Sequence, residues 1–375
     1  MRWRRPCIDN SPASRALAPP RLPATVRSHR STAMIRTETD IRARKMIWGA
    51  ISRIMETGGF RKSIADGGQE LNRFKHYLEV LRGNEPDPRD ATPPGDLDID
   101  PWVLPIFPGL HNVPWPNASD YEWVPIVERF YESLKAEAQR IRESFITMSY
   151  AGTDASQQAK WRQGFVSAFG TRLPDAYFAA GTIPSEAHRL VEALPADDYA
   201  GNSHYAFADA FYSWLDPKYV VKGHHSADNF RVRCQLALDI PGDCYLKVAG
   251  EERTWTEGKV LLLDDSYWHE AVNNSDRHRG VFLTDFWHPD LTIPERRALR
   301  AAFGKKEVRL LFLHMRALPQ TIIDQFMPLF DQVDRTDAEI SRRWTSTPDT
   351  SHVPDVLARI KVMHEQAGKK KGYTA

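Results

Sequence analysis

Residues 230–240 read FRVRCQLALDI, and this stretch decides the fold class. Apolar and polar side chains alternate along it, which is the period of a β-strand with one apolar face. The apolar positions are Phe230, Val232, Cys234, Leu236, Leu238 and Ile240, and the polar ones are Arg231, Arg233, Gln235 and Asp239. We therefore predict a strand over this stretch.

Similar short runs follow it, namely YLKV, RTWT, KVLLLDD and RGVFLTDFW, and turn residues separate them. Short strands at this spacing indicate an antiparallel sandwich or barrel. The chain on either side has apolar residues at helical spacing, for example over residues 120–145 and beyond Pro294. The expected fold is thus a mainly β core with flanking helices.

The same patterns divide the chain into five expected segments. They are residues 1–45, a disordered leader or a start codon placed too early; 46–83, a helical segment; 84–104, a linker rich in Pro and Asp; 105–303, the main domain; and 304–375, a C-terminal helical region. The first segment is rich in Arg, Pro, Ala and Ser, so a targeting peptide is a third interpretation of it.

Composition argues against several classes of protein. A formal net charge of +1 provides no basic excess for binding nucleic acid. We find no apolar run of about 18 residues and expect no membrane span. The three cysteines, Cys7, Cys234 and Cys244, are too unevenly placed for a metal-binding pair and favour a reducing, cytoplasmic location.

Polar chemistry gathers between two apolar runs, in DDSYWHEAVNNSDRHRG at residues 264–280. His269 lies in this stretch, and His224 ends the earlier run YVVKGHH just before a strand. Two neutral imidazoles can bind divalent iron and leave other coordination positions open. The alternatives are ordinary hydrogen-bonded histidines, or a Ser266–His269 pair for acyl transfer without the usual glycine elbow.

Arg279 follows His269 by ten residues and has the planar, charged fork that matches a carboxylate with two hydrogen bonds. Ser213, in FYSWLDP, can add a hydroxyl donor beside it. These residue types suit a dicarboxylate bound next to a metal. Arg233, taken alone, is most simply explained as a solvated residue on the polar face of its strand.

Several stretches together resemble the aspartyl/asparaginyl β-hydroxylase family. They are FPGLHNVPW, HHSADNFRVRCQLALDIP and RTWTEGKVLLLDDSYWHEAVNNSDRHRGVFLTDFWHPDL, within residues 105–292. The family consists of iron(II)- and 2-oxoglutarate-dependent oxygenases built on a double-stranded β-helix, a jelly roll of the cupin type. The resemblance implies this fold for residues 105–303, with Fe(II), 2-oxoglutarate and O2 as cofactor and co-substrates.

Carried over residue by residue, the resemblance makes His224 and His269 the iron ligands. It makes Arg279, helped by Ser213, the partner of the distal carboxylate of 2-oxoglutarate. Arg233 would hold the end of the co-substrate nearer the metal. These assignments explain the polar stretch between the apolar runs, because His269 and Arg279 would bind the iron and its co-substrate.

Two positions depart from related patterns. Many iron oxygenases have an acid two residues after the first histidine, where this chain has Ser226, although the β-hydroxylase branch commonly has a small residue there. An alternative register makes His225 the ligand with Asp228 nearby. Where family members often have a histidine after the strand arginine, this chain has Gln235, which can donate a hydrogen bond but carries no charge.

The expected function is hydroxylation of an unactivated C–H bond. The resemblance points to the β-carbon of an Asp- or Asn-type residue in a peptide, or of a free or carrier-bound amino acid. The alternatives are a metal-binding cupin without oxygen chemistry, such as an isomerase or a binding protein, and an iron halogenase. Arg279 and Ser213 argue against the first alternative, because a plain metal cupin has no use for a carboxylate clamp.

Overall fold

The computed structural model describes residues 38–91, 99–147, 160–316 and 318–370. All of them belong to one compact unit. The predicted leader lies outside the described residues as far as position 37. No helix in the described part of the chain combines the length and apolar character of a membrane span.

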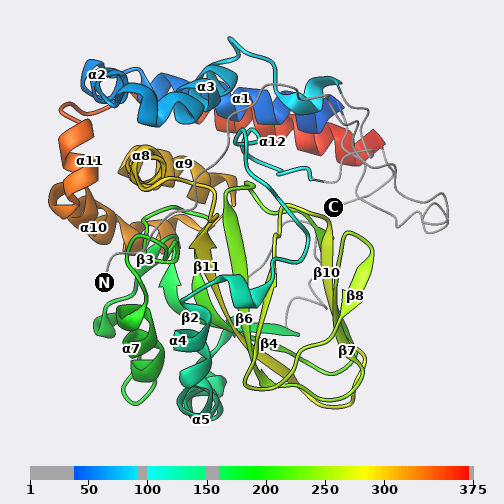
Figure 1. Ribbon diagram of the computed structural model, residues 1–375. Coiled ribbons are helices and arrows are strands. Elements are labelled where there is room, and N and C mark those ends of the chain that lie inside the picture. The colour runs from blue at the N-terminus through cyan, green and yellow to red at the C-terminus, as the bar shows by residue number, and fades with distance from the viewer. Residues whose placement is uncertain (1–37, 92–98, 148–159, 317, 371–375) are drawn as a thin grey trace, which may run out of the picture. The chain divides into compact units, whose positions relative to one another are not determined.

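The core consists of two antiparallel sheets (Figure 1). The strands of the larger sheet are β1 (Ile146–Thr147), β2 (Trp161–Ala168), β3 (Thr171–Arg172), β4 (Ala210–Leu215), β6 (Arg231–Asp239), β9 (Val260–Leu263) and β11 (Arg279–Trp287). Those of the smaller sheet are β5 (Tyr219–His224), β7 (Cys244–Val248), β8 (Glu251–Arg253) and β10 (His269–Asn273).

The strand order identifies the fold. In the larger sheet β4, β11, β6 and β9 are neighbours in that order, and in the smaller sheet the order is β5, β10, β7, β8. From β4 to β11 the chain therefore alternates between the two sheets, apart from the β7–β8 hairpin. This is the jelly-roll topology of a double-stranded β-helix, and the predicted fold is confirmed.

Strand β6 has the predicted alternation of apolar and polar residues, but its polar face does not meet solvent. Its apolar residues pack outward in a cluster with α4 (Val124–Arg129), α5 (Tyr131–Ile141) and α7 (Ser185–Ala193). Its other face lies between the sheets, where Ala237 packs with residues of both. Arg231, Arg233 and Gln235 consequently point into the barrel rather than into water. An apolar strand face usually points into the barrel and a polar one into solvent. Here helices cover the apolar face from outside, so the polar face points inward.

A layer of helices packs against one end of the barrel (Figure 1). Its members are α1 (Glu38–Met55), α2 (Gly58–Asp66), α3 (Asn72–Arg82), α8 (Ile293–Gly304), α9 (Lys306–Met315), α10 (Gln320–Thr336), α11 (Ala338–Arg343) and α12 (Val353–Lys370). The first and last of these, α1 and α12, lie side by side. The two predicted helical additions thus form one layer.

Helix α1 begins at Glu38, earlier than the predicted start at residue 46. Its first turn carries Glu38 and Asp40, and acids at that end interact favourably with the helix dipole. The helical spacing of apolar residues did not predict this first turn of α1, because the regular apolar positions begin farther along the chain.

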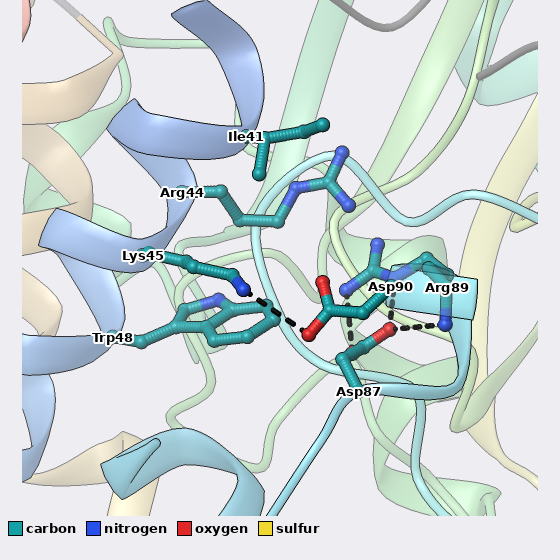
Figure 2. Close-up of a pocket in the computed structure, with 7 residues that line it drawn as sticks. All are labelled: Ile41, Arg44, Lys45, Trp48, Asp87, Arg89 and Asp90. Atoms are coloured by element: carbon teal, nitrogen blue, oxygen red, sulfur yellow. Dashed lines mark hydrogen bonds and ion pairs between the residues drawn. The ribbon is translucent and has the colours of Figure 1, made fainter. Parts of the chain in front are cut away.

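The described parts of the predicted linker 84–104 are packed against α1 and the barrel. The indole of Trp48 donates to the carbonyl of Val103 at 2.7 Å, and Lys45 pairs with Asp90 at 3.1 Å (Figure 2). The pocket in Figure 2 has a volume of about 10 Å³, room for roughly one water molecule. It is therefore too small for an organic substrate.

Candidate active site

Two histidines on neighbouring strands of the smaller sheet face each other. His224 ends β5, His269 begins β10, and the two residues are direct partners in the strand register. Their ring centroids lie 4.2 Å apart. The sheet thus brings together the two predicted metal ligands.

Backbone carbonyls hold both rings in one tautomer. The Nδ1 atom of His224 lies 2.8 Å from the carbonyl oxygen of Lys222, and Nδ1 of His269 lies 2.9 Å from that of Tyr267. A carbonyl oxygen accepts and cannot donate, so Nδ1 carries the proton in each neutral ring. The lone pair then resides on Nε2, the arrangement of a metal-binding histidine. Burial lowers the pKa of both imidazoles, that of His269 well below its usual range.

The neighbouring histidine has different partners. Nδ1 of His225 lies 2.8 Å from the carbonyl oxygen of Ser266, and its ring packs 5.5 Å from that of Trp268. Asp228, the acid of the alternative register, is fully buried in an ion pair with Arg231 at 2.9 Å. His224, and not His225, is the strand partner of His269 and faces its ring, which favours His224 as the ligand. The ligand assignment stays a prediction.

Arg279 begins β11 on the larger sheet and is buried. Its guanidinium carbon lies 4.5 Å over the ring of Trp255, and burial lowers its pKa to about 10. Among the described residues, its buried Nε and Nη1 atoms have no hydrogen-bond partner and no carboxylate lies within ion-pair distance. In the part of the chain that the structure describes, Arg279 is therefore a buried cation without an anionic partner, as the predicted carboxylate clamp requires.

Ser213 and Gln235 lie close to Arg279. Ser213 is two residues before Leu215, the strand partner of Arg279, so it is a diagonal neighbour on the same face. Its Oγ accepts a hydrogen bond from Trp161 at 3.0 Å and keeps its own hydrogen to donate. Gln235 accepts from the indole of Trp255 at 3.0 Å. One side of the predicted co-substrate site is thus assembled by three strands and the loop that carries Trp255.

Arg233 is already bound by two carboxylates. Its Nε lies 2.9 Å from Asp285 and 3.1 Å from Asp265, and its Nη2 donates to Asp285 at 3.2 Å. Burial opposes its charge, but these two acids raise its pKa above the usual value. The predicted contact between Arg233 and 2-oxoglutarate stays a prediction, and it would use the remaining nitrogen, Nη1.

Sequence reasoning missed three side chains of this site. Trp255 and Asp285 stand in the stretches that carry the family resemblance, and Asp265 lies in the polar stretch 264–280. Its neighbour Asp264 stabilises the turn after β9, because its Oδ1 accepts from the amide and hydroxyl of Ser266 at 3.0 and 2.6 Å. No sequence period reveals the other three, because their contacts join distant strands.

The side chains around His224 and His269 determine whether an iron ion fits the site. Within the described ranges, no group of three or more His, Cys, Asp or Glu side chains gathers as a metal site. The two Nε2 atoms nevertheless supply a pair of nitrogen donors of the type that iron(II) accepts. The residues therefore fit a metal held by two protein ligands, with the other positions left to co-substrate and water.

Part of the chain is similar to a known protein family. Residues 128–289 match the family described as aspartyl/asparaginyl beta-hydroxylase. Human aspartate beta-hydroxylase domain-containing protein 2 is 42% identical over 187 residues, 48% of each chain. Its rat counterpart is 41% identical over 206 residues, 53% of this chain and 58% of the relative. The chain spans about half the length of these curated relatives.

Among solved structures, a prolyl-4-hydroxylase from Pseudomonas putida matches 43% of this chain and 87% of its own, at 16% identity and a TM-score of 0.28. The strand order described above defines the class of protein, a double-stranded β-helix of the cupin type with flanking helices. Within that class, residues 128–289 of the barrel domain are similar to the aspartyl/asparaginyl beta-hydroxylase family.

Proposed function

We propose that the protein is an iron(II)- and 2-oxoglutarate-dependent dioxygenase that hydroxylates an unactivated C–H bond. The observation that carries this proposal is the buried guanidinium of Arg279, which lacks an anionic partner among the described residues. A buried charge without a partner costs several kcal/mol. A carboxylate of the co-substrate would offset that cost. A metal-binding cupin that uses no such co-substrate would have no anion to offset it.

His224 and His269 would hold the iron through Nε2. Bound there, iron(II) supplies the oxygen chemistry that couples decarboxylation of 2-oxoglutarate to hydroxylation of the substrate. The carbonyls of Lys222 and Tyr267 keep the two rings oriented. The protein thus contributes ligand geometry before any small molecule binds.

The remaining side chains would orient the co-substrate and exclude water. Arg279 and Ser213 would donate to its distal carboxylate, and the ring of Trp255 shields one face of the guanidinium. Removing water around a charged pair strengthens the attraction between its members. Asp285 and Asp265 fix Arg233 nearer the histidines.

We propose as substrate the β-carbon of an Asp- or Asn-type residue in a peptide, or of a free or carrier-bound amino acid. The names of the relatives, which refer to aspartate beta-hydroxylase, support this choice. We also propose a cytoplasmic location, because Cys234 and Cys244 are free thiols, the state that reducing compartments maintain.

A halogenase is the remaining alternative, since no acid stands two residues after His224. Ser226 is buried and donates its hydroxyl hydrogen to the carbonyl of Asp228 at 2.6 Å. It is therefore engaged in the loop rather than offered to a metal. We expect hydroxylated product alone even in high chloride, and Ser226→Ala should keep most activity. A chlorinated product from the wild-type protein would contradict this expectation.

The function is tested by incubating the purified chain with iron(II), 2-oxoglutarate and a peptide and amino-acid library. We expect succinate, and library members that gain the mass of one oxygen atom. His269→Ala should abolish both. Wild-type protein that forms no succinate with any library would refute the proposed dioxygenase.

A further inference from the structure

A cation from the helical layer lies near the active site. Arg316 directly follows α9, and its side chain is 17% exposed. Its guanidinium carbon lies 4.9 Å from the ring of Phe207 and 5.3 Å from that of Phe169. Within the described residues its ion pair is with Asp209, at 3.7 Å, which is too long for a good hydrogen bond.

The contacts of Asp209 place Arg316 at one end of the barrel. Asp209 directly precedes β4, and its amide donates to Asp285 at 2.9 Å. Asp285 in turn binds Arg233, which also pairs with Asp265. The carbonyl of Asp265 accepts from the amide of Ser226 at 2.8 Å, two residues after His224. Ser213 lies four residues farther along the same strand, about 13 Å away at the usual strand rise. Arg316 is therefore at the histidine end, opposite the Arg279 clamp.

An exposed aromatic ring contacts Phe207, the same residue that Arg316 contacts. Trp102 is 43% exposed, and its ring lies 5.7 Å from that of Phe207 in an edge-to-face contact. Its amide donates to the carbonyl of Ser226 at 2.8 Å, two residues after His224. Phe207 thus links a tryptophan near the histidines to the guanidinium of Arg316.

On the basis of the proposed function, we propose that Arg316 and Trp102 select the substrate. Arg316 binds a carboxylate beyond the reacting carbon, and the exposed ring of Trp102 packs against the chain next to it. The substrate class is accordingly an acidic peptide. Two aromatic faces orient the guanidinium and remove part of its water, which prepares it for a carboxylate.

Substrate selection by Arg316 and Trp102 would take place outside the segment that matches the family model. Trp102 precedes the matched residues 128–289 and Arg316 follows them. Iron and co-substrate would be held by the barrel, while the flanking segments would recognise the substrate. The helical layer would then have a function besides stability.

The test measures binding of two synthetic peptide libraries that differ only in Asp and Glu against Asn and Gln. The full chain is immobilised, and retained peptides are quantified by mass spectrometry at low and high salt. Wild type should retain the acidic library at least tenfold better than the amide library. Arg316→Gln should remove this preference, Arg316→Lys should keep part of it, and Trp102→Ala should weaken retention of both.

Arg189→Gln is the matched control. Arg189 also lies over an aromatic ring, Phe130 at 6.0 Å, and pairs with Glu186, but it belongs to the outer helix α7. This variant should bind as wild type does. Equal or absent retention of both libraries by wild type, or an unchanged preference in Arg316→Gln, overturns the proposal. Succinate formation by the same wild-type protein separates this outcome from failure of the proposed dioxygenase.

Discussion

The guanidinium of Arg279 lies 4.5 Å over the ring of Trp255, and both side chains are buried. Trp255 also donates to Gln235 at 3.0 Å. The tryptophan therefore fixes the cation and a neighbouring amide with the same ring. Such a preformed arrangement reduces the ordering cost when a carboxylate binds.

Arg279→Ala should weaken 2-oxoglutarate binding by about 30-fold or more. Loss of one partner from a buried charge pair costs about 2–5 kcal/mol, and each 1.4 kcal/mol is about tenfold in affinity. Arg279→Lys should recover part of the loss, because it keeps the charge but not the fork. The measurement is succinate formation as a function of 2-oxoglutarate concentration.

The matched control for this variant is Arg253→Ala. Arg253 lies 4.7 Å from the ring of Trp115, but its side chain is 44% exposed. The variant removes an arginine stacked on a tryptophan without removing a buried cation. Its dependence on 2-oxoglutarate should match that of wild type. An equally unchanged dependence in Arg279→Ala would contradict the carboxylate clamp.

His224→Ala and His269→Ala should each lose bound metal, because one imidazole is too few protein ligands to keep iron(II) against water. His225→Ala should keep it, because His224 rather than His225 pairs with His269 across the strands, and the His225 ring packs against Trp268 instead. Metal content after dialysis, measured by elemental analysis, decides the matter, with circular dichroism as the check on folding. Loss of metal in His225→Ala with retention in His224→Ala would show that the register is shifted by one residue.

The strands of the barrel could be predicted from the sequence more completely than the side-chain contacts between distant parts of the chain. Alternation over β6 and the turns after it were sufficient to predict a set of strands. The residue types alone made His224 and His269 candidate ligands, and the resemblance added the topology and the other site roles. Alternation gives two faces but does not say which one helices will cover, so only the co-substrate role that the resemblance gave Arg233 indicated an inward polar face of β6. The contacts of Trp255, Asp285 and Arg316 join residues far apart in the chain. The periodic pattern of a short stretch of sequence cannot predict such contacts.

The stability contributed by Asp264 should fall as pH rises. Burial raises the pKa of this carboxyl to about 7, against about 3.9 in an unfolded chain. A folded-state pKa above the unfolded one stabilises the protein fully below about pH 4, and this contribution is lost as pH rises through about 7. As pH rises from about 5 to 8, the melting temperature of wild type should therefore fall relative to that of Asp264→Asn. A difference that is constant or moves the other way would contradict the prediction.

Gly223→Ala should disturb the metal site although glycine has no side chain there. A Cβ atom at Gly223 would come within 2.2 Å of the ring of Trp268, whose chain neighbour is His269. The ring must move, and overpacking of this kind costs about 1–3 kcal/mol. We expect a lower melting temperature and weaker metal retention on dialysis.

The control is Gly242→Ala, where a Cβ would meet nothing within 4 Å, so its stability should stay within about 0.5 kcal/mol of wild type. Equal metal retention in the two variants would show that the contact with Trp268 does not support His224 and His269.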